Sequence, residues 1–311
     1  MRVIVFGGTG WLGHHIVLQL LAAGHEVTIC CRGQKKAFAD EVAQVKTVYA
    51  DKHDEAAVRE LFRTPYDAVI DSVPTPECIA NIHKYAVNIS RYIHCSSTGG
   101  YAPLPFIPCD ETAPYCGFCR KGWLGKVEND KEVMRLFHSE GFPATVIRPT
   151  YITGPGLLPM DNLGGRRKDY IADILAEKTL DVPDNGLALL QPVQVRDLAA
   201  SFALALETPR SIGQIYNISL SHALPLVRYH EITAAAFGKK ANLNFLPVDD
   251  MLKKYEGAIS EMGLRFLSTH MCFSIEKARR DLGYVPHCSP EEAVEETVYW
   301  AAGQPRTSLY G

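Results

Sequence analysis

The spacing of hydrophobic and polar positions predicts strands that alternate with helices from the first residues onward. Residues 3–6 form a short unbroken apolar run, which is typical of a parallel strand buried on both faces, and glycines follow it directly. The next apolar positions recur at helical spacing up to Gly24, which stands where a helix C-cap belongs, and residues 27–30 form a second strand. This strand, helix and strand occupy about 30 residues, the size of one βαβ unit.

The same alternation continues after this unit. Three further pairs of elements follow, with helices at 54–63, 77–88 and 126–139 and strands at 68–70, 92–94 and 144–147. Strands that alternate with helices predict an α/β fold, a Rossmann-type doubly wound parallel sheet that helices cover on both faces.

The pattern loosens after Pro149 into Gly and Pro loops with isolated helices such as 168–177. Two later pieces, a helix at 197–207 and a strand at 214–218, could rejoin the sheet. We therefore expect two interleaved parts. They are a dinucleotide-binding Rossmann domain over 1–150, to which 195–219 returns, and a smaller C-terminal substrate-binding lobe formed by 151–194 and 220–311.

Composition narrows the class of protein and of partner. The chain of 311 residues is 47% hydrophobic, enough for a sizeable core, which excludes a disordered protein. Lys and Arg total 32 against 35 Asp and Glu, so no surplus of positive charge is left to bind nucleic acid or an anionic bilayer. We find no signal peptide, no apolar run near the roughly 20 residues that span a bilayer, and an odd number of Cys, nine. We expect a cytoplasmic protein with reduced thiols.

A glycine-rich turn joins the first strand to the first helix. Residues 7–13 read GGTGWLG, and glycines here allow a tight turn, let the backbone approach a pyrophosphate and bring the helix against the strand. Because a strand, a helix and a second strand surround this turn, we expect it to bind a dinucleotide. The candidate cofactor-binding residues in the turn are Gly7, Gly10, Trp11, Leu12 and Gly13.

The end of the second strand bears on the choice of dinucleotide. An NAD site usually has a carboxylate there for the ribose 2′-hydroxyl, whereas this chain has Arg32, followed by Lys35 and Lys36. A guanidinium can bind a 2′-phosphate, so we expect NADP, with NAD as the alternative if this basic loop is merely solvated. Asp51 could meet the adenine edge, and Ser72 is a further candidate for cofactor binding.

These motifs resemble the extended short-chain dehydrogenase/reductase superfamily, and within it the NAD(P)-dependent epimerase/dehydratase group. The resemblance runs nearly the whole length and rests on the turn at 7–13, HCSST at 94–98, RP at 148–149 with GPG at 154–156, VRDLA at 195–199, GQIYN at 213–217, and KAR at 277–279 with LGY at 282–284. In this order the motifs are specific for the fold and the group, though not for one reaction. The resemblance implies hydride transfer between a nicotinamide and a carbinol or carbonyl carbon.

The catalytic residues that the resemblance implies are incomplete. In the group a Tyr of a YxxxK motif exchanges the hydroxyl proton, a Ser or Thr orients the oxygen, and the Lys lowers the pKa of the Tyr and holds the nicotinamide ribose. Ser97 matches the Ser and Lys126 matches the Lys, but the Tyr position is Gly122. Another group would then donate the proton: Tyr101, Tyr151 or Lys126 itself. Alternatively the reaction needs only assisted hydride transfer.

A catalytically atypical protein is the competing hypothesis. An atypical branch of the group, with chloroplast stem-loop-binding members, keeps the fold and lacks the Tyr. A protein of this kind would bind NAD(P) as a redox sensor, or would bind RNA or another protein. The near-neutral charge argues against RNA as the main ligand.

The resemblance also bears on the substrate. Nucleotide-sugar epimerases usually carry an Arg seven residues before the Asp of VRDLA, where this chain has Leu190. The loss of that charge-assisted contact disfavours a nucleotide-diphosphate sugar, although Arg166, Arg167 and Lys168 could form a substitute clasp. We expect a small sugar-like, polyol or carbonyl substrate, and the resemblance allows a homodimer.

Two smaller features of the sequence do not require a metal or redox site. Cys116 and Cys119, with Cys109 upstream, have the spacing of a redox or metal site, but no second paired cluster is visible, so we expect no metal. His14 and His15 begin the helix after the glycine turn, where a capping or packing role fits better than metal binding.

Overall fold

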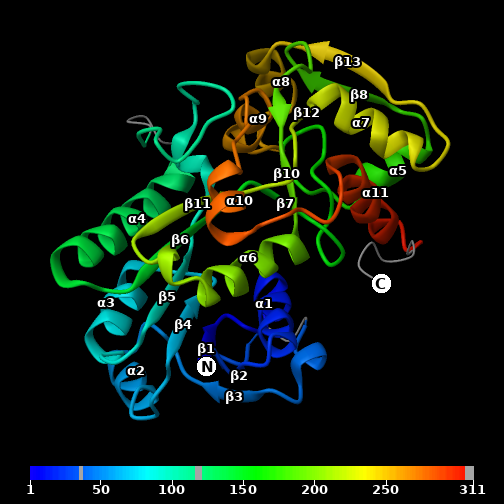
Figure 1. Ribbon diagram of the computed structural model, residues 1–311. Coiled ribbons are helices and arrows are strands. Elements are labelled where there is room, and N and C mark those ends of the chain that lie inside the picture. The colour runs from blue at the N-terminus through cyan, green and yellow to red at the C-terminus, as the bar shows by residue number, and fades with distance from the viewer. Residues whose placement is uncertain (35–37, 116–120, 305–311) are drawn as a thin grey trace.

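A seven-stranded parallel sheet forms the centre of the computed structural model, which describes residues 1–34, 38–115 and 121–304 (Figure 1). Its strands lie in the order β11-β6-β5-β4-β1-β2-β3. The order runs outward in one direction from β1 and in the other from β4, so the gap between these two strands is the switch point where such sheets bind ligands. The strands are β1 (Arg2–Phe6), β2 (Glu26–Cys31), β3 (Lys46–Tyr49), β4 (Ala68–Asp71), β5 (Arg91–Cys95), β6 (Ala144–Pro149) and β11 (Gln214–Ile218).

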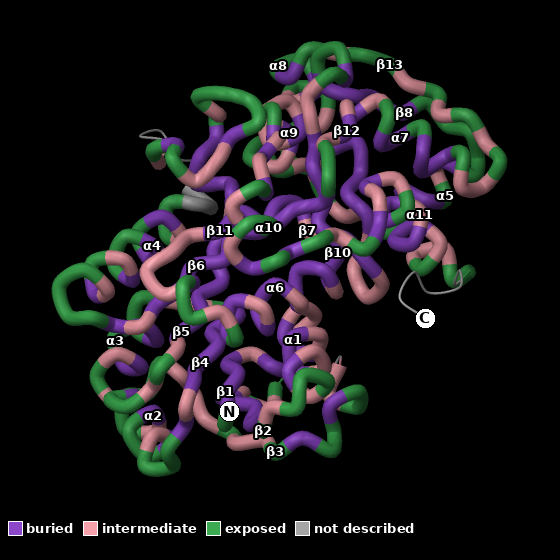
Figure 2. The backbone as a smooth tube through the Cα atoms, in the orientation of Figure 1, coloured by how far each residue is buried: buried purple, intermediate pink, exposed green. Residues whose placement is uncertain are grey.

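Helices cover both faces of the sheet because successive side chains of each strand point to opposite faces. In β1, Val3 and Val5 join one hydrophobic cluster, and Ile4 and Phe6 join the other. Figure 2 shows this strand as largely buried. The first cluster includes side chains of α1 (Trp11–Ala22), α6 (Val195–Glu207) and α10 (Glu276–Leu282). The second includes side chains of α2 (Glu55–Leu61), α3 (Pro76–Tyr85) and α4 (Lys121–Glu140).

The second part of the chain forms a smaller lobe around a core of its own, at the top of Figure 1. Three two-stranded sheets belong to it, β7 (Tyr151–Thr153) with β10 (Pro192–Gln194), β8 (Thr179–Pro183) with β13 (Asn242–Leu246), and β9 (Leu189–Leu190) with β12 (Leu224–Pro225). Its helices are α5 (Tyr170–Leu175), α7 (Leu226–Ala235), α8 (Val248–Lys254), α9 (Glu261–Leu267) and α11 (Pro290–Ala301). None of the helices in the described ranges is long and apolar enough to cross a membrane.

The predicted fold class is confirmed, with differences at particular elements. The strand expected at 214–218 has those bounds and pairs with β6, so the chain does return to the sheet. The helix expected at 126–139 already begins at Lys121. The prediction missed its first residues because two glycines there weaken the helical pattern of the sequence. The predicted helix 168–177 is only Tyr170–Leu175, and β3, α7, α8, α9 and α11 were not predicted.

Candidate functional site

The glycine turn lies at the carboxyl edge of the sheet, directly after β1. Gly7 has a φ of +81°, and its amide donates to the carbonyl oxygen of Cys30 at 3.1 Å. The amide of Gly10 donates to the Gly7 oxygen at 2.9 Å, and α1 then starts with no side-chain cap and no acidic residue in its first turn. The free amides of this helix N-terminus favour an anionic group, as a dinucleotide pyrophosphate requires.

A cleft of about 490 Å³ opens beside this turn. It is lined by Phe6, Gly7, Thr9, Gly10, Trp11, Cys30, Cys31, Arg32, Gly33, Gln34, Phe38, Ala50, Lys52, His53 and Val73. Four of the predicted cofactor residues are therefore at the cleft: Gly7, Gly10, Trp11 and Arg32. Burial raises the pKa of Cys30 to about 12, so this thiol faces the cleft as a neutral group.

The other predicted cofactor residues lie outside the cleft lining. Ser72 lies beneath the turn, where its hydroxyl donates to the Phe6 carbonyl at 2.8 Å. Asp51 accepts hydrogen bonds from the backbone and the ring of His53, at 3.0 and 2.8 Å, and these bonds lower the pKa of Asp51. Leu12 packs against the hydrophobic core.

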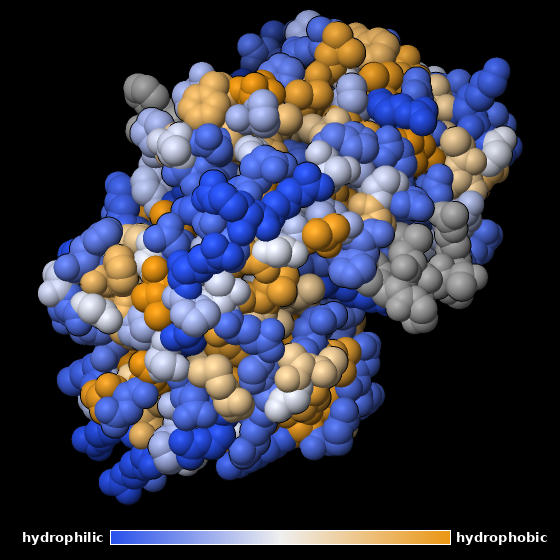
Figure 3. All heavy atoms as spheres, in the orientation of Figure 1, coloured by the Kyte–Doolittle hydropathy of each residue, from blue (hydrophilic) through white to orange (hydrophobic). Residues whose placement is uncertain are grey.

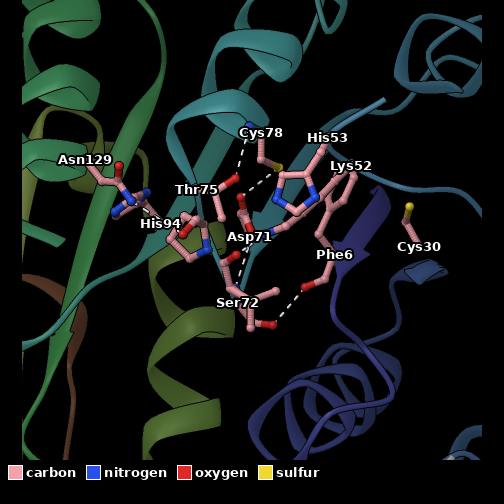
Figure 4. Close-up of polar contacts among 12 residues, drawn as sticks. Phe6, Cys30, Lys52, His53, Asp71, Ser72, Thr75, Cys78, His94 and Asn129 are labelled. Carbon is pink, nitrogen blue, oxygen red and sulfur yellow. Dashed lines mark hydrogen bonds and ion pairs between the residues drawn. The ribbon is translucent and has the colours of Figure 1, made fainter. Parts of the chain in front are cut away.

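Lys52 is a cation of the cleft that the sequence analysis missed (Figure 4). Its ammonium group donates to the carbonyl oxygen of Val73 and lies 3.9 Å from a carboxylate oxygen of Asp71. Asp71 ends β4, is fully buried and also accepts a hydrogen bond from the thiol of Cys78 at 3.2 Å. Lys52 thus compensates a buried negative charge at the switch point and adds positive charge to the cleft wall. The only signal in the sequence was its position after Asp51.

Trp11 links the cleft to the second lobe. Its indole nitrogen donates to the carbonyl oxygen of Pro155 at 2.7 Å. A Cβ on Gly156 would lie 2.8 Å from the Trp11 ring, so the loop approaches the indole as closely as a glycine permits. The motifs at 7–13 and 154–156 are therefore in direct contact.

A second cavity, of about 250 Å³, contains two of the predicted catalytic residues. Ser97 follows β5 and accepts a hydrogen bond from the amide of Gly99 at 3.2 Å, which starts the short helix η2 (Thr98–Tyr101). Tyr151 begins β7. The cavity is lined by Ser97, Thr98, Gly99, Thr150, Tyr151, Met160, Gly164, Met262, Gly263, Phe266 and Met271.

The phenol of Tyr151 is held by three neighbours. The amide of Met160 donates to its oxygen at 2.6 Å, and the Tyr229 hydroxyl lies 3.4 Å away. A guanidinium nitrogen of Arg166 is also 3.4 Å from this oxygen, and the guanidinium carbon lies 4.8 Å from the ring centre. A cation therefore lies beside the phenol that lines the cavity.

The other two predicted catalytic residues, Tyr101 and Lys126, line neither the cleft nor this cavity. Tyr101 is buried and its hydroxyl accepts a hydrogen bond from Arg148, while burial raises the pKa of Tyr101 to about 12. Lys126 is half-buried in α4, and among the described residues it forms no hydrogen bond or ion pair. Gly122 is in the first turn of this helix.

A buried charge network that joins α4, β5 and β6 was not predicted. The guanidinium of Arg148, from β6, pairs with the carboxylate of Asp130, from α4, at 2.9 Å. That carboxylate also lies 3.1 Å from the ring of His94 in β5, and the guanidinium donates to the phenols of Tyr101 and Tyr115. Burial would raise the pKa of Asp130, but the contact with His94 and the charge of Arg148 hold it below its usual value.

The smaller predictions have mixed outcomes. The ring of His14 donates to the Gly10 carbonyl at 3.0 Å and stacks on Phe38 at 4.4 Å, so it packs within the protein, whereas the predicted capping role is not observed because α1 has no side-chain cap. No cluster of three or more potential metal ligands occurs among the residues that the structure describes. Four residues of interest lie outside the described residues, namely Lys35, Lys36, Cys116 and Cys119.

Comparison with known proteins places the chain in a family. Residues 3–83 and 77–219 match the family described as the NAD dependent epimerase/dehydratase family. The chain belongs to this family. Membership indicates a nicotinamide cofactor and chemistry of the NAD(P)-dependent epimerase, dehydratase and reductase kind. The glycine turn, the free amides of α1 and the cations of the cleft fit such a cofactor.

The individual relatives are distant in sequence. The chain is 26% identical over 313 residues to the chloroplast stem-loop binding protein of 41 kDa b of Arabidopsis thaliana, with 95% of this chain and 78% of the relative covered. It is 24% identical over 262 residues to the 2′-dehydrokanamycin reductase of Streptomyces kanamyceticus, with 83% and 73% covered.

Solved structures share the fold. A UDP-glucose-4-epimerase from Stenotrophomonas maltophila with bound NAD and formylated UDP-arabinopyranose has a TM-score of 0.77 at 17% identity, over 97% of this chain and 98% of that one. A dTDP-glucose 4,6-dehydratase from Bacillus anthracis in complex with NAD also has a TM-score of 0.77, at 15% identity, over 97% of each chain.

Proposed function

We propose that this family member is an NAD(P)-dependent oxidoreductase or epimerase that acts at a hydroxyl or carbonyl carbon of a small sugar-like, polyol or carbonyl substrate. One observation carries the proposal: Ser97 and Tyr151 line one cavity, at the sheet edge where the glycine turn lines the cofactor cleft. When bound, the nicotinamide supplies or accepts the hydride. The Ser97 hydroxyl binds the substrate oxygen, and Lys126 binds the nicotinamide ribose.

Tyr151 is the residue that we propose for proton exchange in place of the missing Tyr. It is the one phenol that lines the cavity within the described residues. Arg166 provides the positive charge beside the phenol oxygen that the Lys of YxxxK provides elsewhere in the group. Tyr101 is less suited, because it is buried away from the cavity and its hydroxyl is engaged by Arg148.

The active-site assignment is tested by turnover of polyols, aldoses, ketoses and simple ketones, followed through the nicotinamide absorbance. We expect Tyr151→Phe to lower kcat about 100-fold or more and Ser97→Ala to lower it about tenfold or more. Ser221→Ala, at an exposed serine of the second lobe, serves as the control. Undiminished turnover in both site variants would show that the active site is elsewhere.

NADP is the cofactor that we propose. Arg32 is exposed at the cleft, and no carboxylate residue is among the described residues that line it. Fluorescence titration should show tighter binding of NADPH than of NADH. The Arg32→Ala variant should lose about 10- to 100-fold in NADPH affinity with little change for NADH, since a hydrogen bond to a charged group contributes about 1.5–3 kcal/mol. A preference for NADH would refute the assignment.

A cofactor-binding protein without turnover is the second candidate. Gly122 at the Tyr position favours it, as does the likeness to a stem-loop binding protein. Tight NADPH binding together with no turnover of any substrate would support this candidate against the first.

A further inference from the structure

The cavity beside Ser97 has little capacity to bind a polyhydroxylated molecule. Two of its hydroxyl groups are already engaged within the protein: Thr98 donates to the Pro149 carbonyl at 3.1 Å, and Thr150 lies 2.9 Å from the hydroxyl of Ser219. A sugar in this cavity would give up hydrogen bonds to water that the walls do not replace, at about 1–3 kcal/mol for each unsatisfied group.

The rest of the cavity wall is apolar. It consists of three thioethers, a phenyl ring and three glycines, and no charged side chain is among the described residues that line the space. The apolar side chains are those of Met160, Met262, Phe266 and Met271. Thioethers are flexible and polarizable, make favourable contacts with aromatic rings and adapt to irregular apolar ligands.

The size of the cavity and the nearby arginines argue against a nucleotide diphosphate. About 250 Å³ is below the roughly 300–1,000 Å³ of pockets for drug-sized ligands. Arg166 donates to the carbonyls of Leu158 and Ile152, so it is not left to bind phosphate. Arg167 pairs with Asp173 at 3.1 Å and also binds Asp161 and Asn162. Two of the three residues of the predicted substitute clasp, Arg166 and Arg167, thus bind groups within the protein.

Close backbone packing within the lobe holds the apolar wall in place. A Cβ on Gly164 would lie 2.2 Å from the carbonyl carbon of Gly263, and a Cβ on Gly263 would lie 2.4 Å from the Gly164 oxygen. Only a glycine pair permits this approach, which seats α9 on the 164 loop and holds Met262 and Phe266 at the cavity. Met262 is 44% exposed, so it lies where the cavity meets solvent.

We infer that this cavity takes a small ketone, aldehyde or alcohol with an apolar alicyclic or aromatic body, in preference to a free sugar or a sugar nucleotide. The inference rests on the function proposed above and narrows its range of substrates. The single oxygen of such a compound would meet Ser97 and Tyr151, and its ring would contact the thioethers and Phe266.

The test compares acetophenone and cyclohexanone with dihydroxyacetone and UDP-glucose on the full-length protein with NADPH. Saturation-transfer NMR measures binding, and nicotinamide absorbance measures turnover. We expect the two apolar ketones to bind, and to have a higher kcat/KM than the polar compounds. Met262→Lys should raise the KM for acetophenone about tenfold or more, a loss comparable to that of apolar contacts in an enzyme pocket.

Two further variants control for effects of the lysine on folding and for the added charge. Met262→Gln preserves the side-chain size in case the lysine disturbs folding, and should raise the same KM. Leu187→Lys places the same charge at another exposed apolar residue of the lobe, 53% exposed and outside the cavity lining, and should leave KM unchanged.

The outcomes separate this inference from the proposed function. Better turnover of dihydroxyacetone or UDP-glucose than of the ketones would overturn the apolar substrate class and leave hydride transfer standing. Binding of acetophenone that is weakened by Met262→Lys, without NADPH oxidation, would support the ligand class and count against hydride transfer. Failure of both apolar ketones to bind would overturn the inference.

Discussion

Gly13 shows how the absence of one side chain shapes the cofactor cleft. An added Cβ would lie 2.0 Å from the Gly7 carbonyl oxygen, so no other residue lets α1 pack this closely on the turn. Gly125 in α4 is different, because a Cβ there would meet nothing within 4 Å. Close packing therefore requires a glycine at position 13, whereas position 125 has room for a side chain.

The Gly13→Ala variant should therefore displace the turn. We expect a loss of about 1–3 kcal/mol in the free energy of unfolding and about tenfold or more in NADPH affinity. Gly125→Ala is the matched control and should be neutral or stabilise the protein by up to about 1 kcal/mol, because Ala is the better helix former. Urea unfolding and fluorescence titration measure the two quantities. Equal effects of the two substitutions would contradict the prediction.

His230 predicts how stability depends on pH. It is completely buried, its ring lies 2.6 Å from the Tyr170 hydroxyl, and burial lowers its pKa from 6.5 to about 3. Between these two values the unfolded chain binds a proton that the folded protein does not. The free energy of unfolding should then fall by up to about 1.4 kcal/mol for each pH unit below about 6.5.

Urea unfolding between about pH 7 and about pH 4 measures this slope, and His230→Phe should reduce it. His15, whose pKa burial also lowers to about 3, is present in both proteins, so the difference between the slopes isolates His230. The same slope in both proteins would refute the prediction.

At the level of secondary structure, the charge network joins α4, β5 and β6. Asp130 on the helix binds Arg148 on one strand and His94 on the next, all of them buried. Each group compensates the buried charge or polarity of another, so the network fixes how α4 lies on the sheet.

The Asp130→Asn variant should leave the guanidinium of Arg148 without its counter-charge. We expect a loss of about 3–5 kcal/mol in the free energy of unfolding, as for other buried pairs that lose one partner. Glu132→Gln, in the same helix, removes an exposed ion pair with Arg135 and should cost less than about 1 kcal/mol. Chemical denaturation compares the two variants, and similar losses would contradict the proposed role of burial.

Across the two lobes, the hydrogen bond from Trp11 to Pro155 connects the cleft beside the glycine turn with the second lobe. Hydrophilic residues gather across the middle of the face in Figure 3, over α10, and hydrophobic residues gather around α8, α9 and β13 at its upper end.

The Trp11→Phe variant keeps a ring at the cleft but removes the hydrogen bond to Pro155. The free energy of unfolding should fall by about 0.5–1.5 kcal/mol, the usual contribution of one hydrogen bond. Trp300→Phe removes the same group from a residue that is 39% exposed and should change stability by less than about 0.5 kcal/mol. Urea unfolding measures both, and an equal effect would show that the contact between the lobes contributes nothing.

The parallel class of the sheet, most of its strands and the place of the glycine turn were predictable from the amino-acid sequence. These depend on local properties. Apolar runs identify buried strands, helical spacing identifies the covering helices, and glycines permit the backbone of the turn wherever the rest of the chain lies. The lobe was less predictable, because its short strands and helices have weak periodicity and form only against one another.

Which side chains meet at the candidate site was decided by the tertiary structure. Tyr101 and Tyr151 were equal candidates along the chain, yet one is buried against Arg148 and the other lines the cavity with Ser97. Likewise Arg166 could have bound phosphate, but its guanidinium donates instead to backbone carbonyls of its own lobe. These outcomes depend on contacts between residues distant along the chain, and on which charges burial forces to pair, neither of which a local pattern encodes.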